Sequence, residues 1–214
     1  MRFDVEAILF DIDGTLVDST PAVERSWRTW AARRDLDAEA ILRICHGRRS
    51  EDTIRSLLPP DKVAAAVRDI EAIELADLDD VVALPGAAAL LAQLPEDRWA
   101  AVTSGPRTLM RARLAAGGLP VPSVLVAAED VANGKPDPEG YLLAASALGF
   151  DAARCLVVED APAGIAAGRA AGAAVLAVAT SHAPAELDAD MVVPDLRACV
   201  LERTDGRLHV IARQ

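Results

Sequence analysis

Short apolar runs alternate with longer, alanine-rich stretches along most of the chain. The runs are long enough for buried strands and lie at residues 5–10, 99–102, 124–126, 155–158 and 173–178. The stretches between them predict helices at residues 86–94, 107–116, 138–148 and 162–171. Strands that alternate with helices of this length indicate a parallel sheet with right-handed crossovers. The sequence therefore predicts an α/β fold: a Rossmann-like parallel sheet with helices on both faces.

The segment from residue 18 to residue 82 breaks this alternation. It contains no strand-like run, and successive helices are predicted at residues 21–34, 38–45, 51–57 and 61–77. We interpret it as an inserted, all-helical cap domain. The catalytic core would then consist of residues 1–17 and 83–214, and the connections near residues 16–19 and 79–85 would act as hinges.

The C-terminal segment has a different pattern. Residues 200–211 alternate around Asp205-Gly206, a dipeptide that favours the tight type I′ turn between two strands. We therefore expect a C-terminal β-hairpin, to which the sequence assigns no role.

Composition narrows the possible partners and compartment. A net charge of −11 and a pI near 4.7 argue against nucleic acid or an anionic membrane as a partner. No apolar run is long enough to span a bilayer, and the N-terminal segment carries acids and is too short for a signal peptide. Three cysteines without metal-binding spacing suggest a reduced protein. We expect a cytoplasmic protein, and a monomer.

Polar clusters follow four of the predicted strands. They are Asp11 with Asp13, Thr103-Ser104-Gly105, Lys135, and Glu159-Asp160. Each alone has a structural explanation: a solvated turn, a helix cap or a surface lysine. Because ligands bind beyond the carboxyl ends of parallel strands, however, the topology brings all four clusters to one crevice. Their conjunction, in this order and at these ends, favours function.

The residue types in these clusters suit phosphate chemistry. Carboxylates at two strand ends form an oxygen-rich site suited to Mg²⁺. A hydroxyl, free backbone N–H groups and Lys135, one of only two lysines in the chain, can bind phosphate oxygens. One aspartate can be a covalent nucleophile, and the second can protonate the leaving oxygen and then activate water.

The same residues carry a family resemblance. Residues 11–15 (DIDGT), 102–105 (VTSG), 134–138 (GKPDP) and 158–164 (VEDAPAG) resemble the four signature motifs of the haloacid dehalogenase superfamily. The helical insertion resembles the family's first-type cap. Residues 19–23 (STPAV) and 45–49 (CHGRR) are most similar to the glycerol-phosphate, 2-deoxyglucose-6-phosphate and related sugar phosphatases.

The resemblance implies a role for each motif. Asp11 is the expected nucleophile, which forms an aspartyl-phosphate, and Asp13 is the expected acid and base. The phosphate is expected to contact Thr103, the backbone N–H of Ser104, and Lys135. The expected Mg²⁺ ligands are Asp11, the backbone carbonyl of Asp13, Asp160, and Glu159 directly or through water.

The cap loop between two predicted helices offers further candidates. Arg48 and Arg49 can make bidentate contacts to a phosphate or to neighbouring hydroxyls, and His46 can touch the substrate. The loop could also be a solvated connector, with His46 capping a helix end.

Together these features predict a Mg²⁺-dependent hydrolase acting on a small sugar or polyol phosphate monoester. A phosphoglucomutase is the main alternative, although Val23 stands where such mutases usually carry a cap-hinge histidine. A non-enzymatic phosphate-binding regulator is a further alternative, which the intact set of acids disfavours.

Overall fold

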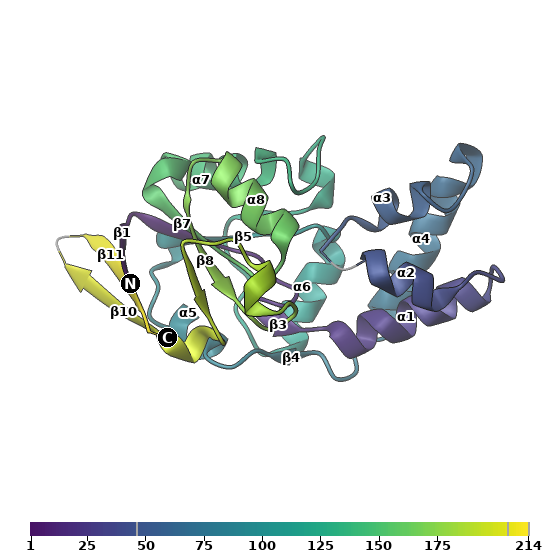
Figure 1. Cartoon of the computed structure of the whole chain (residues 1–214), viewed down its shortest axis with the longest axis horizontal. Coiled ribbons are helices and arrows are strands. Elements are labelled where there is room, and N and C mark those ends of the chain that lie inside the picture. Colours follow the sequence, from purple (N-terminus) through teal and green to yellow (C-terminus); the bar gives the residue numbers. More distant parts are fainter. Residues whose placement is uncertain (46, 205, 214) are drawn as a thin grey trace.

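A six-stranded parallel sheet forms the centre of the protein (Figure 1). The computed structural model describes residues 1–45, 47–204 and 206–213. The strand order is β6-β5-β2-β7-β8-β9, and all neighbours pair in parallel. Their bounds are β2 (Ala7–Phe10), β5 (Trp99–Val102), β6 (Leu125–Val126), β7 (Cys155–Glu159), β8 (Ala174–Val178) and β9 (Met191–Val193). The predicted fold class is confirmed; β9, at the edge of the sheet, was not anticipated.

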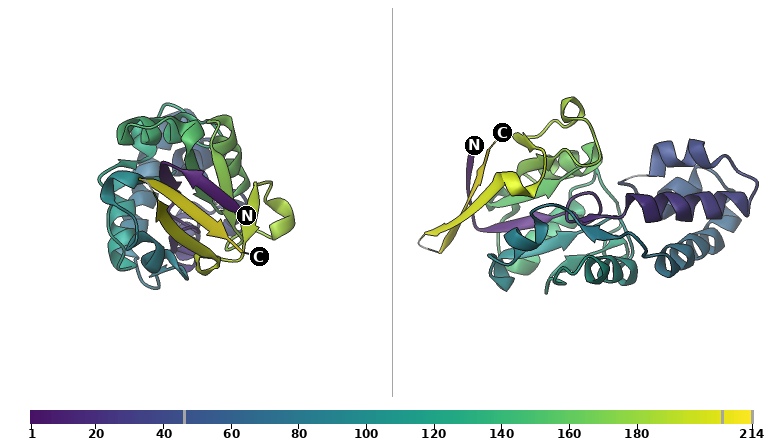
Figure 2. Two further views of the ribbon diagram at one scale, coloured as in Figure 1. Left: turned by 90° about the vertical axis from the view of Figure 1, so that its left-hand side faces the viewer. Right: turned by 90° about the horizontal axis from the view of Figure 1, so that it is seen from below.

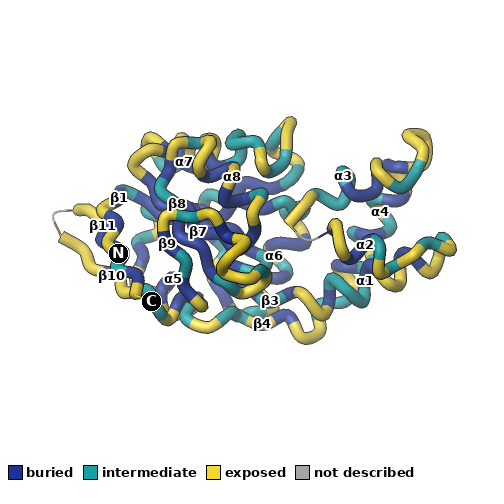
Figure 3. Tube along the Cα trace, in the orientation of Figure 1, coloured by how far each residue is buried: buried dark blue, intermediate teal, exposed yellow. Residues whose placement is uncertain are grey.

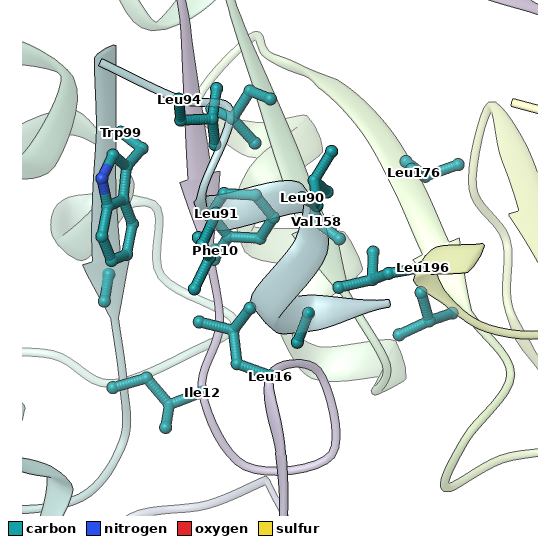
Figure 4. Close-up of a cluster of buried hydrophobic side chains, with 14 of the residues drawn as sticks. Phe10, Ile12, Leu16, Leu90, Leu91, Leu94, Trp99, Val158, Leu176 and Leu196 are labelled. Carbon is teal, nitrogen blue, oxygen red and sulfur yellow. The ribbon is translucent and has the colours of Figure 1, made fainter. Parts of the chain in front are cut away.

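Helices cover both faces of this sheet. The two hydrophobic clusters of the core divide along the alternation of β2: Ile8 and Phe10 belong to one, and Leu9 to the other. The first cluster includes side chains of α5 (Ala87–Leu91) and α6 (Arg107–Ala116), and Figure 4 shows Leu90 and Leu91 beside Phe10. The second includes side chains of α7 (Glu139–Leu148) and α8 (Pro162–Ala170).

The predicted first strand is in fact two strands. β1 (Arg2–Val5) pairs with the C-terminal hairpin of β10 (Cys199–Thr204) and β11 (Arg207–Ala212), whereas β2 belongs to the central sheet. The physical reason lies in the pattern: residues 2–5 alternate between exposed and buried, as in a one-sided antiparallel sheet, and residues 7–10 are buried throughout. The predicted hairpin is confirmed, although Asp205 lies outside the described residues.

Four helices follow β3 (Val17–Asp18) and return to β4 (Val82–Ala83). They have a hydrophobic cluster of their own, centred on Trp30, which supports treating residues 18–82 as a cap domain. Figure 2 shows this group projecting from one end of the sheet, opposite the hairpin. Their bounds are α1 (Thr20–Ala32), α2 (Ala38–Cys45), α3 (Ser50–Arg55) and α4 (Pro60–Ala76).

The two connections between core and cap form an antiparallel pair. β3 and β4 pair through Val17 with Ala83 and Asp18 with Val82. The sequence did not predict these two-residue strands, because a backbone pairing this short leaves no periodic pattern.

The buried residues lie in the interior of the central sheet and on the inner faces of the cap helices (Figure 3). Among the described residues, no helix has the length and apolar character needed to cross a membrane.

The strand order places the polar clusters together. Successive strands are added on one side of β2 as β5 and β6, and then on the other as β7, β8 and β9. The order therefore reverses at β2, and such a reversal opens a crevice at the carboxyl ends of the strands. The cap helices lie at this same end of the sheet (Figure 1).

Candidate active site

Asp11 and Lys135 form the centre of the site. Asp11 follows β2 and is only 7% exposed. The Lys135 ammonium donates to Asp11 Oδ1 at 2.5 Å and to Glu159 Oε1 at 2.6 Å, and its side chain is 8% exposed. One ammonium group thus bridges carboxylates from the ends of two neighbouring strands, β2 and β7.

The Glu159 carboxylate is held by four donors. Its Oε1 accepts from Lys135 and from the Tyr141 hydroxyl at 2.9 Å. Its Oε2 accepts from the backbone N–H groups of Asp160 at 2.9 Å and Ala161 at 3.1 Å. A carboxylate has about four lone-pair positions, so these four donors account for them, and a metal bound directly to Glu159 would have to replace one donor. In this arrangement Glu159 orients Lys135 and fixes the turn that follows β7; its expected contact to a metal stays a prediction.

Asp160 is held in the same crevice by hydroxyl groups. Ser181 donates to Oδ2, and Thr15 donates to Oδ1 at 3.4 Å. Burial, with a smaller effect of the neighbouring Glu159, raises the pKa of Asp160 to about 7. Once such a buried carboxylic acid loses its proton, it binds cations readily, because little water competes for its oxygens.

Burial also dominates the protonation of the central pair. It raises the pKa of Asp11 well above its usual range, and Lys135 opposes this shift. Burial alone would lower the pKa of Lys135, but the carboxylates of Asp11 and Glu159 hold it well above its ordinary value. Lys135 is therefore a permanent cation in a site that has an excess of acids.

Three carboxylates lie close enough to hold one metal ion. Asp11, Glu159 and Asp160 each offer an oxygen within 4.8 Å of the others, and all three are buried. Carboxylate oxygens are the ligands that hard divalent cations prefer, and one lysine cannot neutralise three acids. The residues therefore fit a divalent cation.

Thr103 and Ser104 follow β5 beside this acidic cluster. Thr103 Oγ1 accepts from the backbone N–H of Gly105 at 3.0 Å, which leaves the hydroxyl proton free to be donated. Ser104 Oγ donates to the carbonyl of Gly47 in the cap at 3.1 Å. Both residues line the same pocket as Asp11 and Lys135.

The Asp13 side chain lies to one side of the acidic cluster. Its Oδ1 accepts from Ser19 Oγ and its Oδ2 from Arg113 Nη1, both at 2.7 Å. Asp13 nevertheless lines the same pocket as Asp11. Its expected roles, as the acid and base and as a metal ligand through its backbone carbonyl, stay predictions.

The pocket lies between the core and the cap and has a volume of about 100 Å³. Arg48 lines it and is exposed. Arg49 lies elsewhere: its guanidinium pairs with Asp52 at 3.0 Å and reaches the carbonyl of Ala132 at 3.4 Å. Of the two arginines, Arg48 therefore lines the pocket, and Arg49 is not among its lining residues. His46, the third cap candidate, lies outside the described residues.

Comparison with known proteins identifies the family. The model of the haloacid dehalogenase-like hydrolases matches residues 5–172, and the chain belongs to this family. It is 45% identical over 197 residues to hexitol phosphatase A of Escherichia coli (strain K12), across 89% of this chain and 91% of that protein. It is 36% identical over 193 residues to glycerol-1-phosphate phosphohydrolase 2 of Saccharomyces cerevisiae, across 85% and 77%.

A solved structure agrees with this assignment. A hydrolase from Pseudomonas syringae superimposes with a TM-score of 0.81 and 26% identity, over 89% of this chain and 94% of that one. The family and the enzyme class that the four motifs predicted are thereby confirmed.

Sequence reasoning missed several residues that hold this site together. Tyr141, Ser181 and Ser19 each hydrogen bond to one of the predicted acids. Arg113 and Glu74 form an ion pair beside Asp13. Ser19 lies close to Asp13 in the sequence, which is a weak signal, whereas the other four have none because their partners are distant in the chain.

Gly14 supplies a test of how tightly the acidic loop is packed. Its φ is +85°, and a Cβ there would overlap the Asp160 carboxylate; Gly118 has a φ of +66° but faces open space. Gly118→Ala should lower the free energy of unfolding by about 1–2 kcal/mol, the cost of the left-handed conformation alone. Gly14→Ala should lower it further, because Asp160 must also move. Denaturant titrations measure both; equal losses would contradict the close approach.

Proposed function

We propose that this chain is a Mg²⁺-dependent phosphatase that hydrolyses a small polyol or sugar phosphate monoester through a phosphorylated Asp11. The observation that carries the proposal is the bridge from Lys135 to Asp11 and Glu159, at the base of a pocket between core and cap. The proposal includes that the enzyme is cytoplasmic and monomeric and that its only substrates are small molecules.

Two carboxylates divide the chemistry. The Asp11 carboxylate attacks phosphorus, and the bond from phosphorus to the ester oxygen breaks as Asp13 gives that oxygen a proton. Asp13 then removes a proton from water, which attacks the phosphorus and releases Asp11 and inorganic phosphate. Lys135, the Thr103 hydroxyl and the Ser104 N–H would hold the phosphate oxygens throughout.

The metal would be held by Asp11, Asp160 and the backbone carbonyl of Asp13. Glu159 would contact it directly or through water. A bound Mg²⁺ would supply positive charge that favours ionised Asp11 and withdraws charge from the phosphate. Asp11 needs such a charge, because its burial raises its pKa well above the usual range. Lys135, which donates to Asp11 Oδ1, contributes charge of the same sign.

The cap would select the leaving group. The core residues contact phosphate, which every phosphate ester shares, so they cannot distinguish one ester from another. Arg48 lines the pocket from the cap and has guanidinium donors for hydroxyl groups. The names of the two relatives above, a hexitol phosphatase and a glycerol-1-phosphate phosphohydrolase, support a polyol phosphate.

The pocket disfavours the mutase alternative. Val23 lines it from α1 and has no proton to exchange, where phosphoglucomutases resembling this chain usually carry a histidine. A mutase would convert isomers with little phosphate release, and a binding regulator would do neither. Inorganic phosphate therefore separates the phosphatase from both alternatives, and isomer conversion separates those two from each other.

The first experiment is a phosphate-release screen with Mg²⁺ over glycerol phosphates, hexitol phosphates, hexose 6-phosphates and phosphoglycolate. Asp11→Asn should lower kcat on the preferred substrate by more than about a hundredfold, because a neutral amide is a poor nucleophile. Asp97→Asn is the matched control and should keep full activity, because Asp97 is exposed and precedes β5, whereas Thr103 follows the opposite end of that strand. Substantial turnover by folded Asp11→Asn would refute the phospho-aspartate route.

Metal binding can be measured without turnover. Mg²⁺ at about ten times its Kd should raise Tm by about 3 °C or more relative to NaCl of equal ionic strength, since it binds only the folded chain. Asp160→Asn should abolish the rise, because the cation loses a buried carboxylate ligand, and Asp97→Asn should keep it. An unaltered protein whose Tm does not respond to Mg²⁺ would contradict the metal assignment.

Arg48 tests the role of the cap. Arg48→Ala should lower kcat/KM for the preferred polyol phosphate by at least about tenfold, or roughly 1.4 kcal/mol. The loss should be much smaller for an aryl phosphate, which has few hydroxyl groups to bind. Arg43→Ala, an exposed arginine in the last turn of α2, is the control. Equal losses on both substrates would show that Arg48 does not recognise the leaving group.

A further inference from the structure

A buried arginine joins the core to the cap beside Asp13. Arg113 lies on α6, and its side chain is only 4% exposed. Its Nη1 donates to Asp13 Oδ2 at 2.7 Å, and its Nη2 donates to Glu74 Oε1 at 3.0 Å. Glu74 belongs to α4 of the cap, which packs against α6. One guanidinium group thus links a carboxylate of the catalytic loop to a carboxylate of the cap.

Stability alone does not explain this arrangement. Buried ion pairs are often no more stabilising than hydrophobic residues of the same size, because both charges lose their water. Burial raises the pKa of Glu74, with Arg113 opposing the shift. Arg113 Nε is also buried and has no hydrogen-bond partner among the described residues, which adds a further penalty. A feature that costs this much and touches a proposed catalytic acid suggests a functional use.

Both oxygens of Asp13 are held by groups connected to the cap. Oδ1 accepts from Ser19, which immediately precedes the first cap helix, and Oδ2 accepts from Arg113. Arg113 is in turn held by Glu74 from the last cap helix. The orientation of the Asp13 carboxylate therefore depends on how the cap sits on the core.

We propose that Arg113 is a positioning residue for Asp13, and that Glu74 holds the Arg113 guanidinium in place from the cap. The planar fork of arginine suits this task, because it can present separate N–H groups to two carboxylates at once. The inference rests on the proposed function, in which Asp13 protonates the leaving oxygen. A misplaced Asp13 would leave attack by Asp11 possible but would slow the departure of an alkoxide.

The leaving group supplies the readout. A polyol phosphate needs a proton on its departing oxygen, whereas 4-nitrophenyl phosphate releases a stable anion and needs little help. The ratio of the two kcat/KM values therefore reports proton donation, and a general loss of folded protein lowers both values together. The variants are Arg113→Met, Arg113→Lys and Glu74→Gln, all with saturating Mg²⁺ and with folding checked by circular dichroism.

Each variant has a control on the same helix. Arg111→Met replaces an exposed arginine of α6, and Glu71→Gln a half-buried glutamate of α4. Neither hydrogen bonds to Asp13, Arg113 or Glu74, so both should leave the polyol-to-aryl ratio within about twofold of the unaltered enzyme. Asp13→Asn provides the reference for complete loss of the proton donor.

Arg113→Met should reduce the polyol-to-aryl ratio by at least about tenfold, and Glu74→Gln should reduce it by about threefold or more. Arg113→Lys should recover only part of the loss, because a single ammonium cannot match the fork. In the Asp13→Asn background, Arg113→Met should change the ratio by less than about twofold, since the group it positions is already gone.

The outcomes distinguish a failure of the positioning role of Arg113 from a failure of the proposed function. If Asp13→Asn lowers both substrates equally, Asp13 is not the acid and the proposed function fails at that step. If Asp13→Asn is selective for the polyol phosphate but folded Arg113→Met is not, the positioning role is wrong. Should Arg113→Met fail to fold, Glu74→Gln decides the matter, because it retains the shape of the side chain; an unchanged ratio there overturns the proposal.

Discussion

A shortage of positive charge governs the site. Asp11, Glu159 and Asp160 are buried side by side, and Lys135 is the one ammonium that bridges two of them. Water cannot screen these charges, so each carboxylate must be satisfied by a fixed donor or by a cation. The protein supplies the Tyr141 hydroxyl, the Ser181 hydroxyl and backbone N–H groups. Under the proposed function, a metal ion would supply the positive charge that is still needed.

The parallel sheet makes this concentration of charge possible. The carboxyl ends of parallel strands lie at the same edge of the sheet, and the turns that follow these strands therefore lie next to one another. Gly14 lets the first turn pass close to the Asp160 carboxylate, where a side chain would not fit. Asp11 and Asp160 thus follow directly after buried strands, and Glu159 is the last residue of β7.

Core and cap have different tasks under the proposed function. The core presents groups that recognise phosphate, and the cap closes the pocket with Arg48 and the apolar Val23. Contacts at several points join the two, including Ser104 to Gly47 and Arg113 to Glu74. Substrate choice could therefore change through cap residues while the chemistry at Asp11 stays the same.

The sequence by itself determined the α/β core, the helical segment between residues 18 and 82, the hairpin, and the four motifs. The periodicity of apolar residues and the polar residues at strand ends are local signals, so they can be recognised without knowledge of the fold. The split between β1 and β2, the position of Arg49 beside Ala132, and the bond from Arg113 to Asp13 were decided only by tertiary structure. The contacts of Arg49 and Arg113 join residues 83 and 100 positions apart, and β1 pairs with β11 near the other end of the chain. A single sequence carries no record of which charged side chains will meet once the helices pack.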